Sequence, residues 1–530
     1  MAEVSSPIAF APDGSYAGYA MTSSLGRQFW AFSGIRYARP PVGELRFKAP
    51  LPVEPSMGKV HKATIEGPPC LQIDPLTTIF GITGSEDCLY LNIYTHSLNS
   101  SAPVMLWVHG GGWIWGTGSK IYYGPDFLMN EDVVLITINY RLGPIGFASL
   151  ENEAMTGNYG LKDIEESIRW TKRNAAAFGG DPEAITIFGQ SAGAEGVTLI
   201  LKGPVSGLVK NVIAMSGSSL MPTGARATGS YVRNSTLLLA KCVGCNTDVD
   251  DSEIFRCLQK SDAKRMTSTL ALVPWFINGQ LPPFHPVVEP GGSVPVDPWK
   301  AKTSPEIRLL AGHTTAELGL FETLLAQTGS LLTPFLDMTF NFYAPSILNF
   351  RRSTSNPNRV SRKVREFYFR DNNRLNNYVP IEQAVTDSLF AYPVHKEIEN
   401  HQGPVYSYVF DYKGTPSLYG LLNLANRRTG PGHADDLVFL FRFTLGSGLL
   451  DLTTKGTPED MRLSQKIVRM WTRFAQGLDP TPERLTGDWS RASKEGGYLL
   501  ISNKGFKIVE KANDRSWLRK RLDFWSNLSL

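Results

Sequence analysis

The sequence predicts an α/β protein with a large, mostly parallel sheet whose faces are covered by helices. Two short, almost entirely apolar runs, 104–108 and 133–138, are typical of strands buried on both faces. Residues 160–178 carry apolar side chains three and four positions apart, which predicts a helix that ends at Gly179-Gly180. A strand predicted at 184–188 follows, and this alternation of strands and helices indicates a parallel sheet.

The alternation continues along the chain. Residues 189–202 open with a glycine-rich turn and become helical, and a further strand is predicted at 209–214. The second half has fewer clear signals, with strands predicted at 307–311 and 405–410. Residues 457–477 form a predicted helix, because an N-cap Thr, a Pro in the first turn and two acidic residues mark its start.

Composition limits the class of protein. The chain has 530 residues, of which 42% are hydrophobic and 19% charged, and these values exclude intrinsic disorder and a coiled coil. A length divided by about 150 residues per domain suggests three or four domains. However, no Pro/Ser-rich linker or change of composition divides the chain. We therefore expect one domain that spans residues 1–530.

The charge distribution argues against several partners. The formal net charge of +4 over 530 residues is too weak for a surface that binds a phosphate backbone, so nucleic acid is not an expected partner. No run of about 18 apolar residues occurs, so no transmembrane helix is predicted. Residues 1–14 lack the basic and apolar segments of a secretory signal, which fits a cytosolic protein or a mature form behind a start Met.

Five cysteines allow two local disulfides. Cys70 and Cys88 bracket a loop rich in Gly, Pro and Thr, and Cys245 and Cys257 bracket a polar one. Bridges across loops of this size contribute about 2–4 kcal/mol each. Cys242 is left over, and although its spacing to Cys245 matches half of a zinc or redox site, no second pair or His follows. We expect no metal.

A serine flanked by glycines follows the predicted strand 184–188. The motif Gly189-Gln190-Ser191-Ala192-Gly193 leads directly into the next helix. A sharp strand-to-helix turn imposes strained dihedral angles on the serine and leaves no room for side chains beside it. It raises the serine hydroxyl above the sheet, and the helix N-terminus offers N–H groups to a nearby oxyanion. The motif therefore predicts a nucleophilic serine.

Three consecutive glycines follow another predicted strand, 104–108. The motif is His109-Gly110-Gly111-Gly112-Trp113, and the Gly-Lys-Ser/Thr of a phosphate-binding loop does not follow it. Bare backbone can approach a substrate carbonyl, so two amides of this loop and that of Ala192 would form an oxyanion hole. Both motifs together predict acyl transfer by serine, a reaction for which we expect no cofactor.

A serine nucleophile needs a general base and an acid to orient it. In proteins with this serine motif, the acid and then the histidine follow the serine along the chain. His433 lies in the turn-rich segment 430–436 and is the favoured base, and Glu317 follows the predicted strand 307–311 and is the favoured acid. Competing candidates remain, namely His313, Glu322 and Asp411.

Several longer motifs resemble those of type-B carboxylesterases of the cholinesterase-like family, across nearly the whole chain. They are Phe32-Ser33-Gly34-Ile35-Arg36-Tyr37-Ala38, Pro40-Pro41-Val42-Gly43, Leu45-Arg46-Phe47, Ser85-Glu86-Asp87-Cys88-Leu89-Tyr90-Leu91-Asn92, Asn139-Tyr140-Arg141 and Phe178-Gly179-Gly180-Asp181-Pro182. The chain is particularly similar to arthropod esterases, including the juvenile hormone esterase group. The resemblance implies the α/β-hydrolase fold and a single carboxylesterase domain.

The resemblance also implies roles for individual residues. Ser191 would be the nucleophile, His433 the general acid and base, and Glu317 the acid that orients the imidazole. The remaining positions that it implies are Gly111, Gly112 and Ala192 in the oxyanion hole, and Ser216 as a supporting hydrogen-bond partner. Leu318 stands where the family usually has Gly, so a different loop geometry is expected there.

The same resemblance implies which cysteines form disulfides and which charged residues form ion pairs. It implies the disulfides Cys70–Cys88 and Cys245–Cys257, and the ion pairs Arg46–Glu86 and Arg141–Asp163. Two intact cysteine pairs favour secretion, with the cytoplasm as the alternative. Glycosylation sequons compatible with secretion are present at Asn99, Asn234 and Asn527.

Departures from the family pattern argue against a choline ester as substrate. No Trp lies between Cys70 and Cys88, where cholinesterases use one to bind quaternary ammonium. Gln190 is neutral where cholinesterases carry Glu, and no cysteine follows Cys257 to form the family's third bridge. We therefore expect a neutral, apolar, small-molecule ester. The expected pocket walls, for which core packing is the alternative role, are Trp113, Trp115 and Phe321.

Three functions remain. Detoxification or the degradation of odorant or pheromone esters is favoured, with organophosphates and carbamates as expected inhibitors. Juvenile hormone hydrolysis is the first alternative; Gln190 supports it, whereas Ile164 after Asp163, where that group has Gln, opposes it. A protein that sequesters esters and turns them over slowly is the alternative from another class. The oligomeric state is not predicted.

Overall fold

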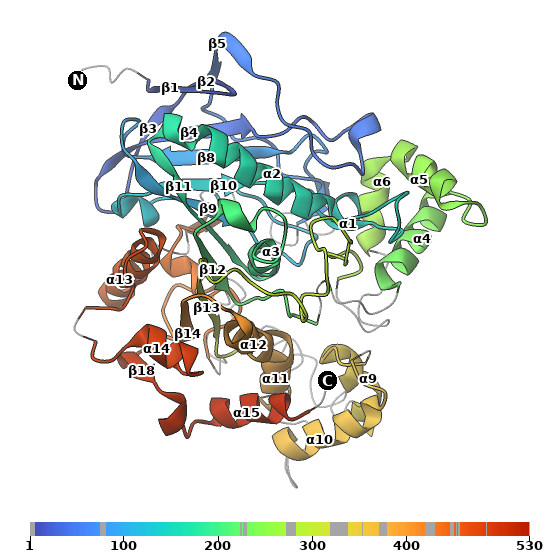
Figure 1. Ribbon diagram of the computed structural model, residues 1–530, viewed down its shortest axis with the longest axis vertical. Coiled ribbons are helices and arrows are strands. Elements are labelled where there is room, and N and C mark those ends of the chain that lie inside the picture. The colour runs from blue at the N-terminus through green and yellow to red at the C-terminus, as the bar shows by residue number, and fades with distance from the viewer. Residues whose placement is uncertain are drawn as a thin grey trace.

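A computed structural model gives the arrangement of the chain (Figure 1). The residues that it describes are 6–74, 81–222, 225, 230–271, 282–317, 338–351, 353–369, 379–418, 430–445, 450–451, 453, 456–483 and 485–528.

Among these residues, eleven strands form one mixed sheet. Its middle is parallel and runs in the order β10, β9, β11, β12, β13, β14, β17. Antiparallel strands extend both edges, with β8, β4 and β3 on one side and β18 on the other. The bounds are β3 Tyr19–Thr22, β4 Gln28–Arg36, β8 Tyr90–Thr95, β9 Ala102–Val108, β10 Val134–Ile138, β11 Gly180–Gln190, β12 Asn211–Met215, β13 Arg308–Thr314, β14 Val405–Asp411, β17 Tyr498–Ser502 and β18 Gly505–Val509.

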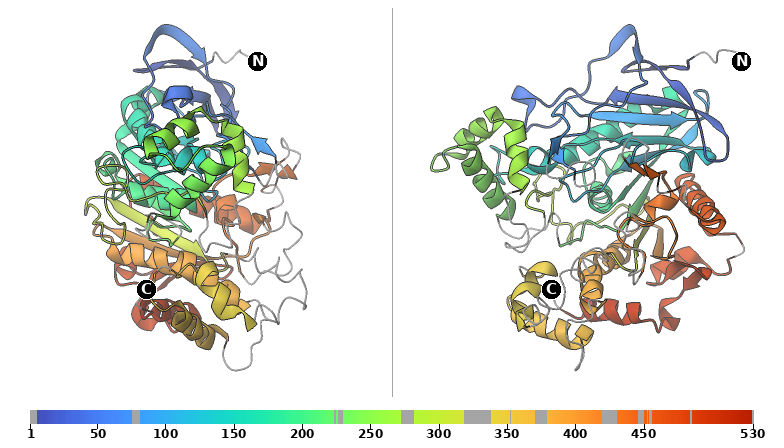
Figure 2. Two further views of the ribbon diagram at one scale, coloured as in Figure 1. Left: turned by 90° about the vertical axis from the view of Figure 1, so that its right-hand side faces the viewer. Right: turned by 180° about the vertical axis from the view of Figure 1, so that it is seen from behind.

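Short strands form smaller sheets, and helices cover the large one. The short strands are β1 Ile8–Ala11, β2 Gly14–Ala17 and β5 Ser56–Lys62, β6 Gln72–Ile73 and β7 Ile82–Thr83, and β15 Thr444–Leu445 and β16 Leu450–Asp451. The helices are α1 Gly143–Phe147, α2 Tyr159–Asn174, α3 Ala192–Ile200, α4 Tyr231–Val243, α5 Asp251–Lys260, α6 Ala263–Ser268, α9 Phe340–Ile347, α10 Pro357–Phe369, α11 Val379–Thr386, α12 Tyr392–Asn400, α13 Pro458–Ala475, α14 Trp489–Lys494 and α15 Trp517–Ser526. Helices α4, α5 and α6 lie together at the right of Figure 1, so they face the viewer in the left view of Figure 2 and lie at the left edge of its right view.

The two faces of the sheet belong to two hydrophobic clusters. Alternate residues of β9 show this, because Val104 and Leu106 pack with α2 and α3, whereas Met105 and Trp107 pack with α13. Since successive side chains of a strand point to opposite faces, a strand buried on both faces is apolar throughout. This explains the unbroken apolar runs in the sequence.

The predicted elements of the sheet are confirmed. Each predicted strand falls on one of β9 to β14, within a few residues at each end. The predicted helix 160–178 is α2 followed by a 3₁₀ turn, Ala175–Phe178, which ends at Gly179 with φ +74°. In α13, Thr457 and Asp460 form a reciprocal capping box, as the sequence indicates.

The predicted covalent and ionic pairs are also present. Disulfides join Cys70 to Cys88 and Cys245 to Cys257, and Cys242 is a free, exposed thiol. Arg46 and Glu86 are 2.6 Å apart, and Arg141 and Asp163, both fully buried, are 2.7 Å apart. In the part of the chain that the structure describes, no helix combines the length and apolar character needed to cross a membrane.

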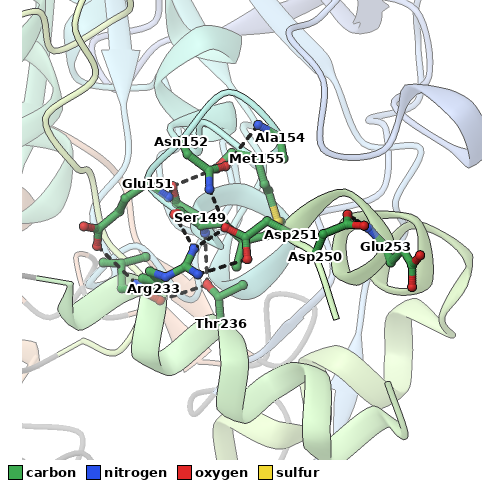
Figure 3. Close-up of polar contacts among 12 residues, drawn as sticks. Ser149, Glu151, Asn152, Ala154, Met155, Arg233, Thr236, Asp250, Asp251 and Glu253 are labelled. Carbon is green, nitrogen blue, oxygen red and sulfur yellow. Dashed lines mark hydrogen bonds and ion pairs between the residues drawn. The ribbon is translucent and has the colours of Figure 1, made fainter. Parts of the chain in front are cut away.

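A polar network attaches the α4–α6 group to the loop after α1 (Figure 3). Arg233 of α4 makes a bidentate ion pair with Asp251 of α5 and donates to the Leu150 carbonyl. Asn152 donates to the same Asp251 carboxylate, and the Glu151 carboxylate accepts the N–H of Arg233. These contacts are half-exposed and lie in loops and helix ends.

Candidate active site

Ser191 occupies a strained turn between β11 and α3. Its φ of +57° and ψ of −127° lie outside the common regions for a residue with a Cβ. A Cβ added at Gly189 would be 2.6 Å from the Gly193 backbone, and one added at Gly193 would be 2.2 Å from the Val108 oxygen. Another added at Gly217 would be 2.3 Å from the Ser191 oxygen. The turn therefore requires glycine on each side of the serine, as its sequence indicates.

His433 is hydrogen-bonded to Glu317. Nδ1 of His433 lies 2.5 Å from Oε2 of Glu317, and the backbone N–H of His433 donates to the Glu317 carbonyl at 3.1 Å. The second carboxylate oxygen accepts the N–H of Thr314 at 2.8 Å, at the end of β13. Glu317 is completely buried. Two residues that are 116 positions apart in the chain are thus held together by both backbone and side chain.

The surroundings favour the ionised form of Glu317. Burial raises the pKa of its carboxyl, but the hydrogen bond and charge of His433, together with Ser216, lower that pKa below its usual value. Ser216 is completely buried and lies close enough to Glu317 to lower the pKa of its carboxyl, so its supporting role stays a prediction. An ionised Glu317 fixes the proton of the imidazole on Nδ1.

The other imidazole nitrogen faces the residue before the serine. With its proton on Nδ1, His433 has a lone pair on Nε2, which lies 3.0 Å from the side-chain nitrogen of Gln190. The Gln190 amide can therefore donate to Nε2. Because Gln190 directly precedes Ser191, this contact places the basic nitrogen at the serine turn.

The segment of His433 is fixed by an acidic neighbour. One oxygen of Asp435 accepts the Gly432 N–H at 2.8 Å, and the other accepts the Ser417 hydroxyl at 2.8 Å and the Leu418 N–H at 3.0 Å. Phe390 packs on the imidazole with ring centroids 4.8 Å apart. Phe390 belongs to a π-helix, Asp387–Ala391, between α11 and α12. Neither Asp435 nor Phe390 was predicted as a site residue.

A second buried acid lies close to this pair. Burial, followed by the charge of Glu317, raises the pKa of Asp436 to about 7, and the hydroxyl of Tyr408 donates to it at 3.0 Å. A protonated Asp436 avoids a second negative charge beside Glu317.

The loop Gly110–Gly112 packs on the serine turn. A Cβ added at Gly110 would be 2.6 Å from the Gln190 oxygen and 3.0 Å from the Cβ of Ser191. Gly111 and Gly112 have φ values of +109° and +60° and are partly exposed. Ala192 begins α3, so its N–H has no acceptor within the helix. The loop and the start of α3 thus both lie beside the serine turn, and their role in binding an oxyanion stays a prediction.

The predicted pocket walls differ in their surroundings. Trp113 is 1% exposed, packs against Phe147 at 4.9 Å and donates its indole N–H to Glu195 at 3.0 Å. Its ring is part of the core and presents almost no surface to a substrate. Trp113 therefore has the packing role that was the alternative to a pocket wall. Trp115 is partly exposed beside the loop. Phe321 and Leu318 lie outside the described residues.

Glu195 is a further residue that the sequence reasoning missed. It is buried in α3, four positions after Ser191, and burial raises its pKa to about 8. A signal was present, since one ionisable residue interrupts the otherwise apolar and small residues of 192–200.

A surface groove elsewhere is separate from these residues. It has a volume of about 470 Å³ and runs along α13, with Arg462, Lys466, Arg469 and Arg473 among its lining side chains. None of the predicted site residues lines it, so it does not mark the catalytic centre.

The chain is similar to known proteins over most of its length. A family model described as "Carboxylesterase family" matches residues 5–525. Juvenile hormone esterase of Tribolium castaneum is 32% identical over 566 aligned positions, which cover 99% of this chain and 94% of that protein. Esterase E4 of Myzus persicae is 35% identical, with 86% and 84% coverage. A crystal structure of juvenile hormone esterase from Manduca sexta, with OTFP covalently attached, has a TM-score of 0.83 at 27% identity and covers 98% of this chain and 99% of that one.

Proposed function

The chain belongs to the carboxylesterase family, with the α/β-hydrolase fold, and we propose that it cleaves carboxylic esters through an acyl-enzyme on Ser191. The observation that carries the assignment of residues is the chain of contacts from Glu317 through His433 to the serine turn. Because the three side chains come from residues 191, 317 and 433, we also propose that residues 1–530 act as one catalytic domain.

The proposed reaction has two similar halves. Nε2 of His433 removes the proton of Ser191 as its oxygen attacks the ester carbonyl, and Glu317 stabilises the imidazolium that forms. The N–H groups of Gly111, Gly112 and Ala192 then bind the oxyanion; in other acyl-transfer enzymes one such donor contributes about 2.7–4 kcal/mol. His433 protonates the departing alcohol, and a water attacks the acyl-enzyme in the same way.

The contact between Gln190 and His433 gives Gln190 a role in this cycle. In the resting state its amide occupies the lone pair of Nε2 at 3.0 Å. Nε2 has to exchange this neutral donor for the Ser191 hydroxyl before it acts as a base. A neutral Gln190 also places no negative charge beside the alcohol group of the substrate, which favours a neutral ester over a cationic one.

Covalent labelling tests the assignment of the nucleophile. The wild-type protein and Ser191→Ala are treated with an organophosphate and with a carbamate, and the adduct is located by peptide mass mapping. We expect one adduct on Ser191 in the wild type and none in the variant. An adduct on another residue, or none at all, would show that Ser191 is not the nucleophile.

Pre-steady-state kinetics separate turnover from sequestration. With p-nitrophenyl butyrate, an esterase gives a burst followed by steady release of product, whereas a sequestering protein gives the burst alone. We expect steady turnover, since the water that deacylates Ser191 uses the same base and the same oxyanion donors.

The physiological ester is proposed as a neutral apolar one, in detoxification or in odorant or pheromone degradation. Juvenile hormone hydrolysis is the second candidate, favoured by Gln190 and by the similarity to two juvenile hormone esterases. A screen of neutral esters with varied acyl and alcohol parts, which includes juvenile hormone, separates the two. A kcat/KM for juvenile hormone at least tenfold above every other ester would favour the second candidate.

We further propose that the protein is secreted. The two disulfides support an oxidising compartment, and the three sequon residues Asn99, Asn234 and Asn527 are all exposed. Expression in insect cells, followed by treatment with a peptide N-glycosidase, tests this proposal. A loss of mass on treatment supports it, and an unmodified chain retained in the cytosol contradicts it.

A further inference from the structure

A buried acidic side chain lies one turn after the proposed nucleophile. Glu195 is the fourth residue of α3 and is 1% exposed. Its Oε2 accepts the indole N–H of Trp113 at 3.0 Å, and Oε1 has no hydrogen-bond partner among the described residues. An ionised carboxylate with one neutral donor and no counter-ion is costly to bury, whereas a neutral carboxylic acid is far less so.

Trp113 connects the glycine loop to this acid. It directly follows Gly112 and has a φ of +67°, so the loop ends in a strained residue whose side chain turns into the core. Its ring packs on Phe147 at 4.9 Å and on Tyr140 at 6.1 Å, and a Cβ added at Gly196 would be 3.0 Å from its edge. The indole is thus packed against α3 beside Glu195.

The bond between Trp113 and Glu195 joins the two elements that carry the proposed oxyanion donors. Gly111 and Gly112 belong to the loop after β9, and Ala192 belongs to α3. Oxyanion donors act only when their N–H groups point to one position, so the loop and the helix have to keep a fixed separation. The Trp113–Glu195 hydrogen bond is a direct side-chain link between these two elements.

We propose that Glu195 is a positioning residue, which in its neutral form accepts the Trp113 N–H and holds Gly111 and Gly112 in register with Ala192. This inference rests on the proposed function, since it requires that these three amides bind the oxyanion.

The electrostatic surroundings support a neutral Glu195. Burial raises the pKa of Glu195 to about 8, and the hydrogen bond from Trp113 offsets that rise only in part. Tyr140, which packs on Trp113, is itself neutral, because burial, and then the charges of Tyr123 and Glu195, raise its pKa well above 10. The hydroxyl of Tyr140 is already donated to the His109 carbonyl at 2.7 Å.

In the part of the chain that the structure describes, the remaining titratable groups around Trp113 and Glu195 supply no free positive charge. His109 stacks on Tyr140 at 4.3 Å, and burial lowers its pKa to about 4. From α2, Ile164 approaches Gly196, and the neighbouring Asp163 is compensated by its ion pair with Arg141. Among the described residues, no cation shifts the pKa of Glu195. Its ionisation would therefore add an uncompensated negative charge one helical turn after Ser191.

This charge predicts a fall in activity at alkaline pH. Below about pH 8 Glu195 is neutral and the tetrahedral oxyanion is not repelled. Above that pH the carboxylate forms and repels the oxyanion in a site of low dielectric. If the ionised form is inactive, kcat/KM falls about tenfold between pH 7 and pH 9.

The test compares pH profiles of kcat/KM for p-nitrophenyl butyrate, corrected for spontaneous hydrolysis. Glu195→Gln keeps an oxygen that can accept from Trp113 but cannot ionise. Glu165→Gln is the matched control, since Glu165 is a buried Glu on α2 whose pKa is also raised by burial. We expect the tenfold alkaline fall in the wild type and in Glu165→Gln, and its loss in Glu195→Gln. An equal fall in Glu195→Gln, or no fall in the wild type, would overturn the proposal.

A second variant tests the link itself. Trp113→Phe removes the N–H but keeps an aromatic ring against Phe147. We expect kcat of Trp113→Phe to fall about tenfold while its KM changes less than threefold. Adding Glu195→Ala to Trp113→Phe should leave kcat at the value of Trp113→Phe alone. Additive losses in the double variant would contradict a shared hydrogen bond.

Labelling keeps this inference separable from the proposed function. One organophosphate adduct per chain on Ser191 in each variant shows that the nucleophile is intact. If Glu195→Gln then has the same pH profile as the wild type, the result counts against the role of Glu195 and not against the proposed function. Full activity in Ser191→Ala would instead refute the proposed function.

Discussion

The two halves of the proposed catalytic site are held together by different means. On the nucleophile side, main-chain contacts fix Ser191, since the glycines on each side of it leave no space for a Cβ. On the acid–base side, His433 and Glu317 lie in connecting segments that side-chain hydrogen bonds hold in place. Asp435 accepts three of these bonds, and two ionisable acids, Glu317 and Asp436, are buried nearby.

This difference predicts different sensitivities. A turn defined by backbone packing fails when volume is added and responds little to pH. A segment held by buried carboxylates tolerates changes of volume better, but its stability depends on which acids are ionised. The following variants separate the two halves.

Gly193→Ala should have the largest effect, on the nucleophile side. The added Cβ would be 2.2 Å from the Val108 oxygen, so the turn has to move. Overpacking of this kind costs about 1–3 kcal/mol, and we expect kcat/KM to fall at least about 100-fold because Ser191 moves with the turn. Gly207→Ala is the control, because its Cβ would meet nothing within 4 Å. Equal activities of the two variants would contradict a turn defined by packing.

Asp435→Ala should have the next largest effect, on the acid–base side. It removes the acceptor of the Gly432 and Leu418 N–H groups and of the Ser417 hydroxyl. Buried donors without an acceptor cost about 1–3 kcal/mol each, so we expect a lower midpoint in guanidinium unfolding and about a tenfold lower kcat. Asp435→Asn keeps one acceptor oxygen and should recover part of both losses. A kcat within twofold of the wild type in Asp435→Ala would show that the bonds do not hold His433.

Asp436→Asn should change the pH dependence of stability rather than activity. The pKa of Asp436 is about 7 in the folded protein, above its ordinary value of about 3.8, so the folded state binds the extra proton between these values. The protonated acid therefore favours folding at low pH, and this contribution is lost as pH rises to about 7. Guanidinium unfolding at pH 4.5 and pH 8 measures the difference.

The expected result is a stabilising substitution at high pH. At pH 8 the Asn variant should be more stable than the wild type by on the order of 1–3 kcal/mol, and the gap should narrow at pH 4.5. The lowered pKa of Glu317 has the opposite effect on the pH dependence of stability. The ionised Glu317 stabilises the fold above the ordinary pKa of a Glu, and this stabilisation is lost as the pH falls through its lowered pKa. A gap between Asp436→Asn and the wild type that does not depend on pH would mean that Asp436 is ionised in the folded protein.

Asp251→Asn should have the smallest effect. It weakens the half-exposed ion pair with Arg233 that joins α4 to α5, far along the chain from the three catalytic candidates (Figure 3). Exposed pairs contribute about 0–1 kcal/mol, so we expect a small fall in the unfolding midpoint and an unchanged kcat/KM. A loss of activity above twofold would show that this network influences the catalytic site.

Much of the sheet could be predicted from the sequence because its parallel strands are buried on both faces. The unbroken apolar runs of β9 and β10 reflect two hydrophobic clusters, one on each face. The antiparallel edge strands, such as β3 and β18, were not predicted, since short strands at an edge have weaker patterns. The disulfides and the two ion pairs were predicted in another way, through the resemblance of separate motifs to a family.

The contacts of Glu195 and Phe390 could not be predicted because they join distant segments, although the lone acid in 192–200 marks Glu195 as unusual. Glu195 is buried against Trp113, which lies 82 positions earlier. Phe390 reaches His433 through a π-helix, whose extra residue has no clear signal in the local sequence. For the same reason Trp113, expected in a pocket wall, lies in the core, where Glu195 satisfies its N–H.

A double-mutant cycle between the two halves of the site measures whether Ser191 and His433 act as one catalytic unit. kcat is measured for Ser191→Ala, His433→Ala and the double variant, with one ester and at one pH. If the two residues act as a unit, each single variant should lose about as much activity as the double, at least about 10⁴-fold. Losses that add in the double variant, or a His433→Ala variant close to the wild type, would show that Ser191 and His433 do not act together.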